Sequence, residues 1–283
     1  MCFLLTSAEE KVFYLMGTYS TIELEKVEDI KKVYKYMRNI ERKLSTYLED
    51  SEVSKINKMA GIGYVKVSSE TIEVIKKALE ISERTYGYFD ITIGAYTINF
   101  KRKGVINEKK AKSLINYKDI LIKGNTVLLK RKWMAIDLGG IGKGYAIEKA
   151  YRYINTEWGF ISIGGEFKIW GKRMPIGIKD PLNGGIIALF VNKEDICVST
   201  SGNYYKEHIE SYDRNVVQVT VLYPDCTYAD AYATAIFAMP ENVRYRFLKE
   251  NPDVGVFILY ADGNTFVNQA FLRYCKRFKV IEK

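Results

Sequence analysis

The sequence predicts an α+β fold in which helices pack on an antiparallel sheet. Two observations carry this expectation. Helical periodicity clusters in the first half of the chain, whereas short strands separated by glycine turns dominate from residue 160 onward. Tight turns at Gly124-Asn125 and Asp262-Gly263 lie between short apolar runs, which indicates hairpins rather than a regular βαβ repeat.

The length and composition favour one folded unit. The chain has 283 residues, of which 47% are hydrophobic and 27% charged, so it can bury a core without staples. It has no internal repeat and no Pro/Ser linker. We expect one domain over residues 1–283, either undivided or built of two closely packed subdomains with a cleft between them. No apolar run approaches the ~18 residues of a membrane span.

Apolar spacing and turn residues place the elements of the first half. The expected helices cover 25–49, a short segment from the cap Ser51 to Asn57, 69–86 with a stop at Gly87, 108–116 capped by Asn107, and 143–156. The expected strands are 12–24 around Gly17-Thr18, an extended run over 91–100, the hairpin 120–122 and 127–129, and a buried strand over 134–138.

Two helices are expected to interrupt the strands of the second half. Apolar spacing places them at 229–238 and 241–250, before a hairpin of 254–260 and 265–268.

The charge balance favours an anionic ligand. Lys and Arg number 43 against 34 Asp and Glu, a net charge of +9. The basic residues are scattered rather than clustered in one arm, so a small anion fits them better than nucleic acid, and we expect no nucleic-acid partner.

The four cysteines are expected to be small buried hydrophobes plus one terminal thiol, Cys2. None forms a C-x-x-C pair, and the single histidine excludes the usual Cys/His zinc sites. Spacing alone supports no disulfide assignment in a chain this long. Residues 1–7 are too short for a signal peptide, so the protein is either cytosolic or lacks its leader here, in which case Cys2 is a candidate lipid attachment site.

Residues 137–145, Asp-Leu-Gly-Gly-Ile-Gly-Lys-Gly-Tyr, join a strand end to a helix start. Glycines let the backbone approach a ligand closely, and a helix N-terminus beside Lys143 favours an anion such as phosphate. The spacing is neither a Walker motif nor G-x-G-x-x-G with an acidic ribose ligand. A plain tight turn before a packed helix explains the same residues.

Asp230 and Thr234 lie four residues apart at the start of a predicted helix, which places both oxygens on one face. A carboxylate with a hydroxyl suits a hard cation such as Mg²⁺. The alternative is an aspartate that complements the helix dipole and a threonine bonded to its own turn.

Taken in order, eight stretches resemble the FAD:protein FMN transferase family, whose members are ApbE-like proteins. The stretches are Met16-Gly17-Thr18, residues 44–57, Gly87 to Thr92, Asp137 to Tyr145, Ile163 to Glu166, Ile178 to Pro181, Thr200-Ser201-Gly202, and Ala229 to Thr234. The resemblance covers about residues 14–240.

The resemblance implies an ApbE-like fold and a metal-dependent transfer of FMN from FAD to a Thr or Ser hydroxyl of an acceptor protein, with release of AMP. It implies Mg²⁺ or Mn²⁺ held by Asp230, Thr234 and the backbone carbonyl of Gly142, where the family usually has alanine. It also implies FAD contacts, which are Met16, Tyr47, Tyr88, Phe89, Asp90, Gly139, Lys143 and Tyr145. It further suggests the extracytoplasmic face of a membrane, with peripheral association.

His208 is the one imidazole available to the chemistry and is the candidate catalytic residue. The family's usual histidine precedes Ile-x-Asp-Pro-x-Thr-Gly, whereas here His208-Ile209-Glu210 passes quickly to the strand over 216–223. This short segment leaves two alternatives open, an FAD pyrophosphatase that forms FMN and AMP, and a non-enzymatic FAD-binding protein.

Overall fold

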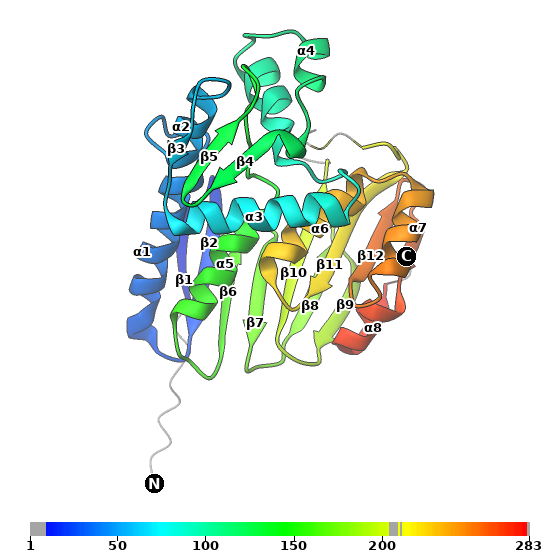
Figure 1. Cartoon of the computed structure of the whole chain (residues 1–283). Helices are drawn as coiled ribbons and strands as arrows, with labels where there is room; N and C mark the ends of the chain where they lie inside the picture. Colours follow the sequence, from blue (N-terminus) through cyan, green and yellow to red (C-terminus); the bar gives the residue numbers. More distant parts are fainter. Residues whose placement is uncertain (1–9, 204–208, 210, 282–283) are drawn as a thin grey trace.

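The central sheet of the computed structural model has eight strands among the residues that the structure describes, which are 10–203, 209 and 211–281 (Figure 1). Every neighbouring pair in it is antiparallel. In spatial order the strands are β1 (Glu10–Leu15), β2 (Thr18–Leu24), β6 (Gly159–Ile163), β7 (Glu166–Trp170), β10 (Ile196–Gly202), β11 (Val216–Tyr223), β12 (Gly255–Tyr260) and β13 (Thr265–Val267).

Apolar residues on both faces of this sheet are buried. Along β12, Val256 and Ile258 join the core beneath the helices, whereas Phe257 and Leu259 join a second core on the opposite face, as the two-residue alternation of a strand requires. The helical layer contains α1 (Val27–Leu44), α3 (Ser69–Arg84), α5 (Gly142–Tyr153), α6 (Cys226–Ala238) and α7 (Glu241–Glu250). The second core includes α8 (Gln269–Tyr274) and a second sheet of three strands. In spatial order these strands are β14 (Cys275–Val280), β9 (Ile186–Asn192) and β8 (Pro175–Lys179).

A third, small sheet lies beside α3 in the upper part of Figure 1. Its strands, in spatial order, are β3 (Val65–Lys66), β5 (Thr126–Leu129) and β4 (Ile120–Lys123). The helices α2 (Glu52–Lys58) and α4 (Glu108–Lys112) lie in the same part of the molecule.

The predicted fold class is confirmed, as are both hairpins and several helix ends. The Ser51 side chain accepts from the backbone N–H of Ser54 at 2.9 Å, and that of Asn107 from Lys110 at 2.8 Å. Helix α3 ends at Arg84, two residues before its predicted end, and Gly87 lies beyond it with φ at +81°, a conformation that glycine adopts without strain.

The extended run predicted over residues 91–100 is wrong. The segment forms a 3₁₀ turn (Ile91–Ile93) and a π-helix (Ala95–Arg102). Asp90 caps the turn by accepting from the backbone N–H of Thr92 at 2.7 Å. The buried residues Ile91, Ala95 and Ile98 recur at helical spacing, but the β-branched residues among them favoured a strand.

The strand predicted over residues 134–138 is also wrong, although the segment is buried as expected. Its backbone hydrogen bonds go elsewhere. The Asn57 side chain accepts from the N–H of Ile136 at 2.7 Å and donates to its carbonyl at 2.9 Å. The N–H of Asp137 donates to the carbonyl of Ile91 at 2.8 Å.

Other differences concern boundaries. The expected strand over 12–24 is the pair β1 and β2, with left-handed Met16 and Gly17 between them. Helices α1 and α4 end earlier than predicted, while α6 begins at Cys226 because the Asp225 side chain caps it. Helix α8 and strand β14 were not predicted.

Two cysteines depart from the expected role of separate buried hydrophobes. Cys197 in β10 and Cys226 in α6 form a disulfide. Both are buried, as expected, but they join two elements covalently across 29 residues of sequence.

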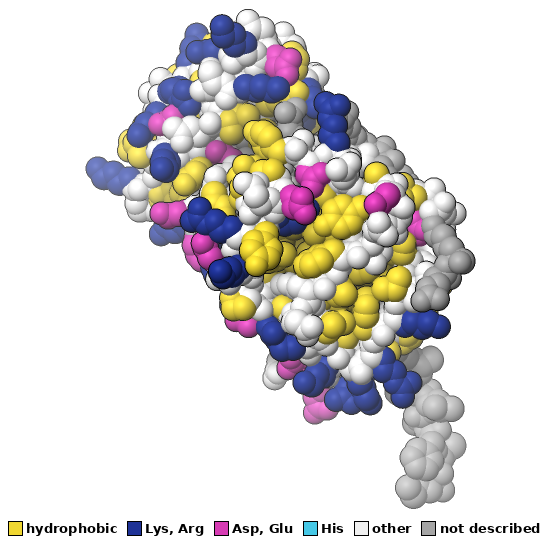
Figure 2. Space-filling model, turned by 90° about the vertical axis from the view of Figure 1, so that its right-hand side faces the viewer, with side chains coloured by type: hydrophobic (Ala, Val, Ile, Leu, Met, Phe, Trp, Pro, Cys, Tyr) yellow, Lys and Arg dark blue, Asp and Glu magenta, His cyan; other side chains and the backbone are white. Residues whose placement is uncertain are grey.

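One face of the molecule exposes many hydrophobic side chains (Figure 2). Figure 2 shows hydrophobic side chains across the middle of one face, with Lys and Arg mostly toward its margins. In the part of the chain that the structure describes, no helix combines the length and the hydropathy needed to cross a bilayer.

Candidate functional site

A glycine corner, residues 139–142, joins the buried segment 134–138 to α5. Asp137 stiffens it, because its carboxylate accepts from the Gly139 N–H at 3.0 Å and from the Thr97 hydroxyl at 2.8 Å. A Cβ added to Gly140 would lie 3.1 Å from the Thr234 hydroxyl and 3.3 Å from the Phe89 ring. At the corner, glycine backbone therefore lies directly against α6 and against the Phe89 side chain.

Asp230 and Thr234 project from α6 toward this corner. Asp230 is 2% exposed, and its Oδ2 accepts from the backbone N–H of Gly144 at 2.9 Å. The Thr234 hydroxyl lies 3.4 Å from the hydroxyl of Ser201 in β10. The predicted shared face is confirmed, although the pair lies in the second and third turns of α6 rather than at its start.

Lys143 and Glu166 form an ion pair beside Asp230. The Lys143 ammonium is 3.5 Å from Glu166 Oε1 and 3.4 Å from the Gly139 carbonyl. Burial lowers the pKa of Lys143, but Glu166 and Asp230 outweigh it and raise the pKa overall. Burial, with Asp230 nearby, raises the pKa of Glu166 to about 7 against the opposing effect of Lys143. The sequence analysis gave Glu166 no role, although it is the last residue of the stretch Ile163 to Glu166.

The donor set of the corner fits a hard divalent cation. Asp230 and Thr234 supply a carboxylate and a hydroxyl, both oxygen donors. Burial raises the pKa of Asp230, so its charge is poorly solvated in the protein alone. Among the described residues, the buried Oε2 of Glu166 has no hydrogen-bond partner. An added cation would stabilise both carboxylates.

The fold and this corner can now be compared with known proteins. A family model described as the ApbE family matches residues 16–258. The chain belongs to the ApbE family. It is 26% identical to the FAD:protein FMN transferase of Vibrio cholerae in an alignment of 246 positions that covers 74% of this chain and 73% of that protein. It is 25% identical to the FAD:protein FMN transferase of Treponema pallidum in an alignment of 279 positions that covers 82% of this chain and 77% of that protein.

A solved ApbE structure shares the architecture. The crystal structure of the ApbE protein from Thermotoga maritima superposes with a TM-score of 0.84 and 26% identity, covering 96% of this chain and 100% of that one. The ApbE-like fold predicted from the sequence is therefore confirmed, and the family match spans the corner, α5 and α6.

The aromatic stretch predicted to contact FAD lies at the corner in part. Phe89 is buried beside Gly140. The Asp90 carboxylate is hydrogen-bonded within the fold: it accepts from the backbone N–H of Thr92 and from that of Tyr117 at 2.8 Å. Burial raises its pKa. The ring of Tyr88 meets that of Tyr212 edge to face at 5.5 Å. An FAD contact for each stays a prediction.

The other predicted FAD residues differ in accessibility. Tyr47 is 77% exposed and has the Arg102 guanidinium 4.4 Å from its ring centre. The Met16 N–H donates to Glu41 at 2.9 Å. Tyr145 is fully buried and its hydroxyl bonds to Glu73 in α3 at 3.1 Å, so its side chain serves the helix contact.

Gly142 and His208 complete the set of predicted site residues. Gly142 is the first residue of α5, and a Cβ added there would meet nothing within 4 Å, so alanine would fit. A role of its carbonyl as a metal ligand stays a prediction. His208 lies outside the described residues; beside it, Asn203 and Ile209 exchange hydrogen bonds of 2.8 and 3.1 Å.

Proposed function

We propose that this chain transfers FMN from FAD to a Thr or Ser hydroxyl of an acceptor protein and releases AMP. The observation that carries the proposal is the corner itself. The cation Lys143, whose side chain is 26% exposed, and two buried carboxylates, Glu166 and Asp230, lie beside bare glycine backbone at a helix start. Membership of the ApbE family and the similarity to the FAD:protein FMN transferases of Vibrio cholerae and Treponema pallidum support the same activity.

The corner suits a pyrophosphate. The corner lies at the N-terminus of the 12-residue helix α5, whose positive dipole end favours phosphate oxygens. Lys143 adds a full positive charge, and glycine leaves room for close approach. FAD is therefore proposed to lie with its two phosphates here and with Phe89 and Tyr88 near its rings.

Asp230, Thr234 and the Gly142 carbonyl are proposed to hold Mg²⁺ or Mn²⁺. When bound, the cation would neutralise negative charge on the phosphate oxygens. The protein's own contribution is to fix the two side chains, which the Gly144 N–H and the Ser201 hydroxyl orient.

In the proposed transfer, the acceptor hydroxyl oxygen attacks the phosphorus of the FMN half. A new P–O bond forms, the bridging P–O bond breaks, and AMP leaves with the bridging oxygen. Lys143 stabilises charge on the phosphates, and His208 is the proposed acceptor of the hydroxyl proton.

The second candidate function is FAD hydrolysis, in which water replaces the acceptor hydroxyl. The short segment after His208 favours it, because only a few residues separate Ile209 from the start of β11 at Val216. A small loop leaves less chain to bind an acceptor protein.

One assay separates the two functions. The protein is incubated with FAD and Mg²⁺, with and without a domain that the Vibrio cholerae relative flavinylates, and AMP and intact protein mass are measured. A flavin adduct formed together with AMP supports transfer. AMP and FMN without any adduct support hydrolysis, and FAD that stays intact under every condition contradicts both.

A further inference from the structure

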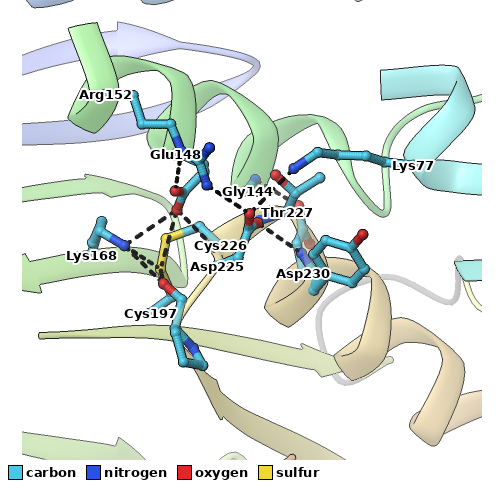
Figure 3. Close-up of a disulfide and its surroundings, with 12 residues drawn as sticks. Lys77, Gly144, Glu148, Arg152, Lys168, Cys197, Asp225, Cys226, Thr227 and Asp230 are labelled. Carbon is cyan, nitrogen blue, oxygen red and sulfur yellow. Dashed lines mark hydrogen bonds and ion pairs between the residues drawn. A yellow bond between two sulfur atoms is a disulfide. The ribbon is translucent and has the colours of Figure 1, made fainter. Parts of the chain in front are cut away.

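The disulfide ties the helix that carries Asp230 to the central sheet (Figure 3). Cys226 is the first residue of α6, one turn before Asp230. Its partner Cys197 lies in β10, four residues before Ser201, on the same side of the strand. Because Ser201 meets Thr234, α6 is fixed to β10 on both sides of Asp230.

A buried ion pair lies directly against this disulfide. Glu148 Oε2 accepts from the backbone N–H of Cys226 at 3.1 Å and from the Lys168 ammonium at 3.3 Å. Lys168 also donates to the carbonyl of Pro224 at 2.9 Å. Glu148 and Lys168 are each 3% exposed. The first turn of α6 is thus fixed by a covalent bond and by charge-assisted hydrogen bonds.

A movement of the first turn of α6 would directly change the geometry of the candidate cation site. Helices α5 and α6 are in backbone contact, since a Cβ added to Gly144 would lie 2.1 Å from the Cys226 carbonyl oxygen. The same Gly144 donates its N–H to Asp230. A shift of Cys226 relative to α5 therefore changes the position of the Asp230 carboxylate.

We propose that the Cys197–Cys226 disulfide and Glu148 position Asp230 for cation binding, so that opening the disulfide weakens the affinity for the divalent cation. This inference rests on the proposed function, because it takes Asp230 as a ligand. Loss of groups that orient metal ligands typically lowers metal affinity by about 10- to 100-fold. We expect the low end, about 10-fold, because other contacts also hold the turn.

Those other contacts surround the capping residue Asp225. Its carboxylate accepts from the Thr227 N–H at 2.8 Å and pairs with Lys77 at 3.2 Å and Arg152 at 3.3 Å. Helix α6 should therefore stay folded without the disulfide, and the expected change is one of position.

The test measures Mn²⁺ binding without FAD, from the electron paramagnetic resonance of free Mn²⁺. The proteins are the oxidised wild type, Cys197→Ala/Cys226→Ala, Glu148→Gln, and the control Val198→Ala. Val198 follows Cys197 in β10 but is buried in the second core, away from α6. Its truncation lowers stability without touching the α6 contacts. Unfolding midpoints are recorded for all four.

The expected result is about 10-fold weaker Mn²⁺ binding for the disulfide and Glu148 variants and unchanged binding for Val198→Ala. With FAD and acceptor, the disulfide variant should need more Mn²⁺ for half-maximal rate but recover its kcat at saturating Mn²⁺. Equal Mn²⁺ affinity in the disulfide variant and the wild type overturns the proposal. A loss of Mn²⁺ affinity in Val198→Ala as large as that in the disulfide variant also overturns it.

The reduced wild type serves as a second route if the double variant does not fold. A phosphine opens the disulfide: the S–S bond breaks, phosphorus takes oxygen from water and is oxidised, and both sulfurs are reduced and take the protons of that water. Thiol titration should find two additional thiols before Mn²⁺ is measured. Failure of the proposed function would appear differently, as absence of Mn²⁺ binding and of transfer in the oxidised wild type itself.

Discussion

Asp230 is buried in α6 with one carboxylate oxygen on the Gly144 N–H, so its negative charge depends on what is bound at the corner. Asp230→Asn keeps the shape and removes that charge. We expect FMN transfer to fall by about 100-fold or more, since charge stabilisation at a phosphoryl group is lost. The rate of adduct formation by mass spectrometry checks this. Asp262→Asn, in an exposed hairpin turn, is the control; equal rates for the two variants would contradict the role of Asp230.

The buried Glu166 carboxylate neutralises Lys143 at the glycine corner. In Glu166→Gln this carboxylate charge is gone, so two effects of opposite direction are expected. Mn²⁺ binding should weaken by about 10-fold, while FAD binding without added metal should tighten because Lys143 is free to face the phosphates. Mn²⁺ resonance and flavin fluorescence in chelator measure the two. Weaker binding of FAD without metal would refute this assignment.

Single residues of the site could be predicted where their spacing from nearby residues in the sequence indicates their role. Asp230 and Thr234 share a helix face, and Lys143 starts a helix after glycines, so the sequence alone placed them. Glu166 was missed because its role comes from burial and from Lys143, which is 23 residues away. The disulfide was missed for the same reason, since only the contact of α6 with β10 brings the two sulfurs together.

At the scale of elements, the α5–α6 contact allows a matched test within one helical turn. Gly144→Ala would place a Cβ 2.1 Å from the Cys226 carbonyl oxygen, whereas Gly142→Ala meets nothing within 4 Å. We expect Gly144→Ala to lower the free energy of unfolding by about 1–3 kcal/mol through overpacking. Gly142→Ala should be neutral or stabilise by up to about 1 kcal/mol. Urea unfolding checks both, and equal values for the pair would rule out the close helix contact.

The contact of α1 with α3 has a pH-dependent ion pair. Glu70 and Lys43 are 2.8 Å apart, and hydrogen bonding to Lys43 lowers the pKa of Glu70 to about 2. A lowered folded-state pKa stabilises the fold above the unfolded pKa and is lost as pH falls toward 2. Glu70→Gln should therefore cost about 1–3 kcal/mol of unfolding free energy at pH 7. Urea unfolding should show this difference vanishing near pH 2; a difference independent of pH would contradict the assignment.

Elements were predictable where capping residues or turns mark them, as at Ser51, Asn107 and Gly124-Asn125. They were mispredicted where tertiary contacts replace local ones. Residues 134–138 are extended and buried, yet the Asn57 side chain occupies the positions that a neighbouring strand would take. Nothing in the sequence of residues 134–138 indicates that a side chain, and not a neighbouring strand, bonds to their backbone.

Over the whole molecule, the antiparallel sheet with helices on one face followed from the order of helical and hairpin patterns. The second sheet on the other face did not, because it pairs β9 with β14, which lie more than 80 residues apart. Both layers matter for the site: the helical layer carries Lys143 and Asp230, and the sheet beneath supplies Glu166 and Ser201.

The most direct test of the account combines FAD, Mg²⁺ and an acceptor domain with the wild type and with the Asp230→Asn variant. Intact-mass spectrometry of the acceptor and chromatography of AMP follow the reaction over time. We predict an adduct with the mass of FMN less one water, one AMP per adduct, and both products formed about 100-fold or more slowly by Asp230→Asn. An adduct formed equally well by Asp230→Asn, or wild-type FAD left intact with Mg²⁺ and acceptor present, would contradict it.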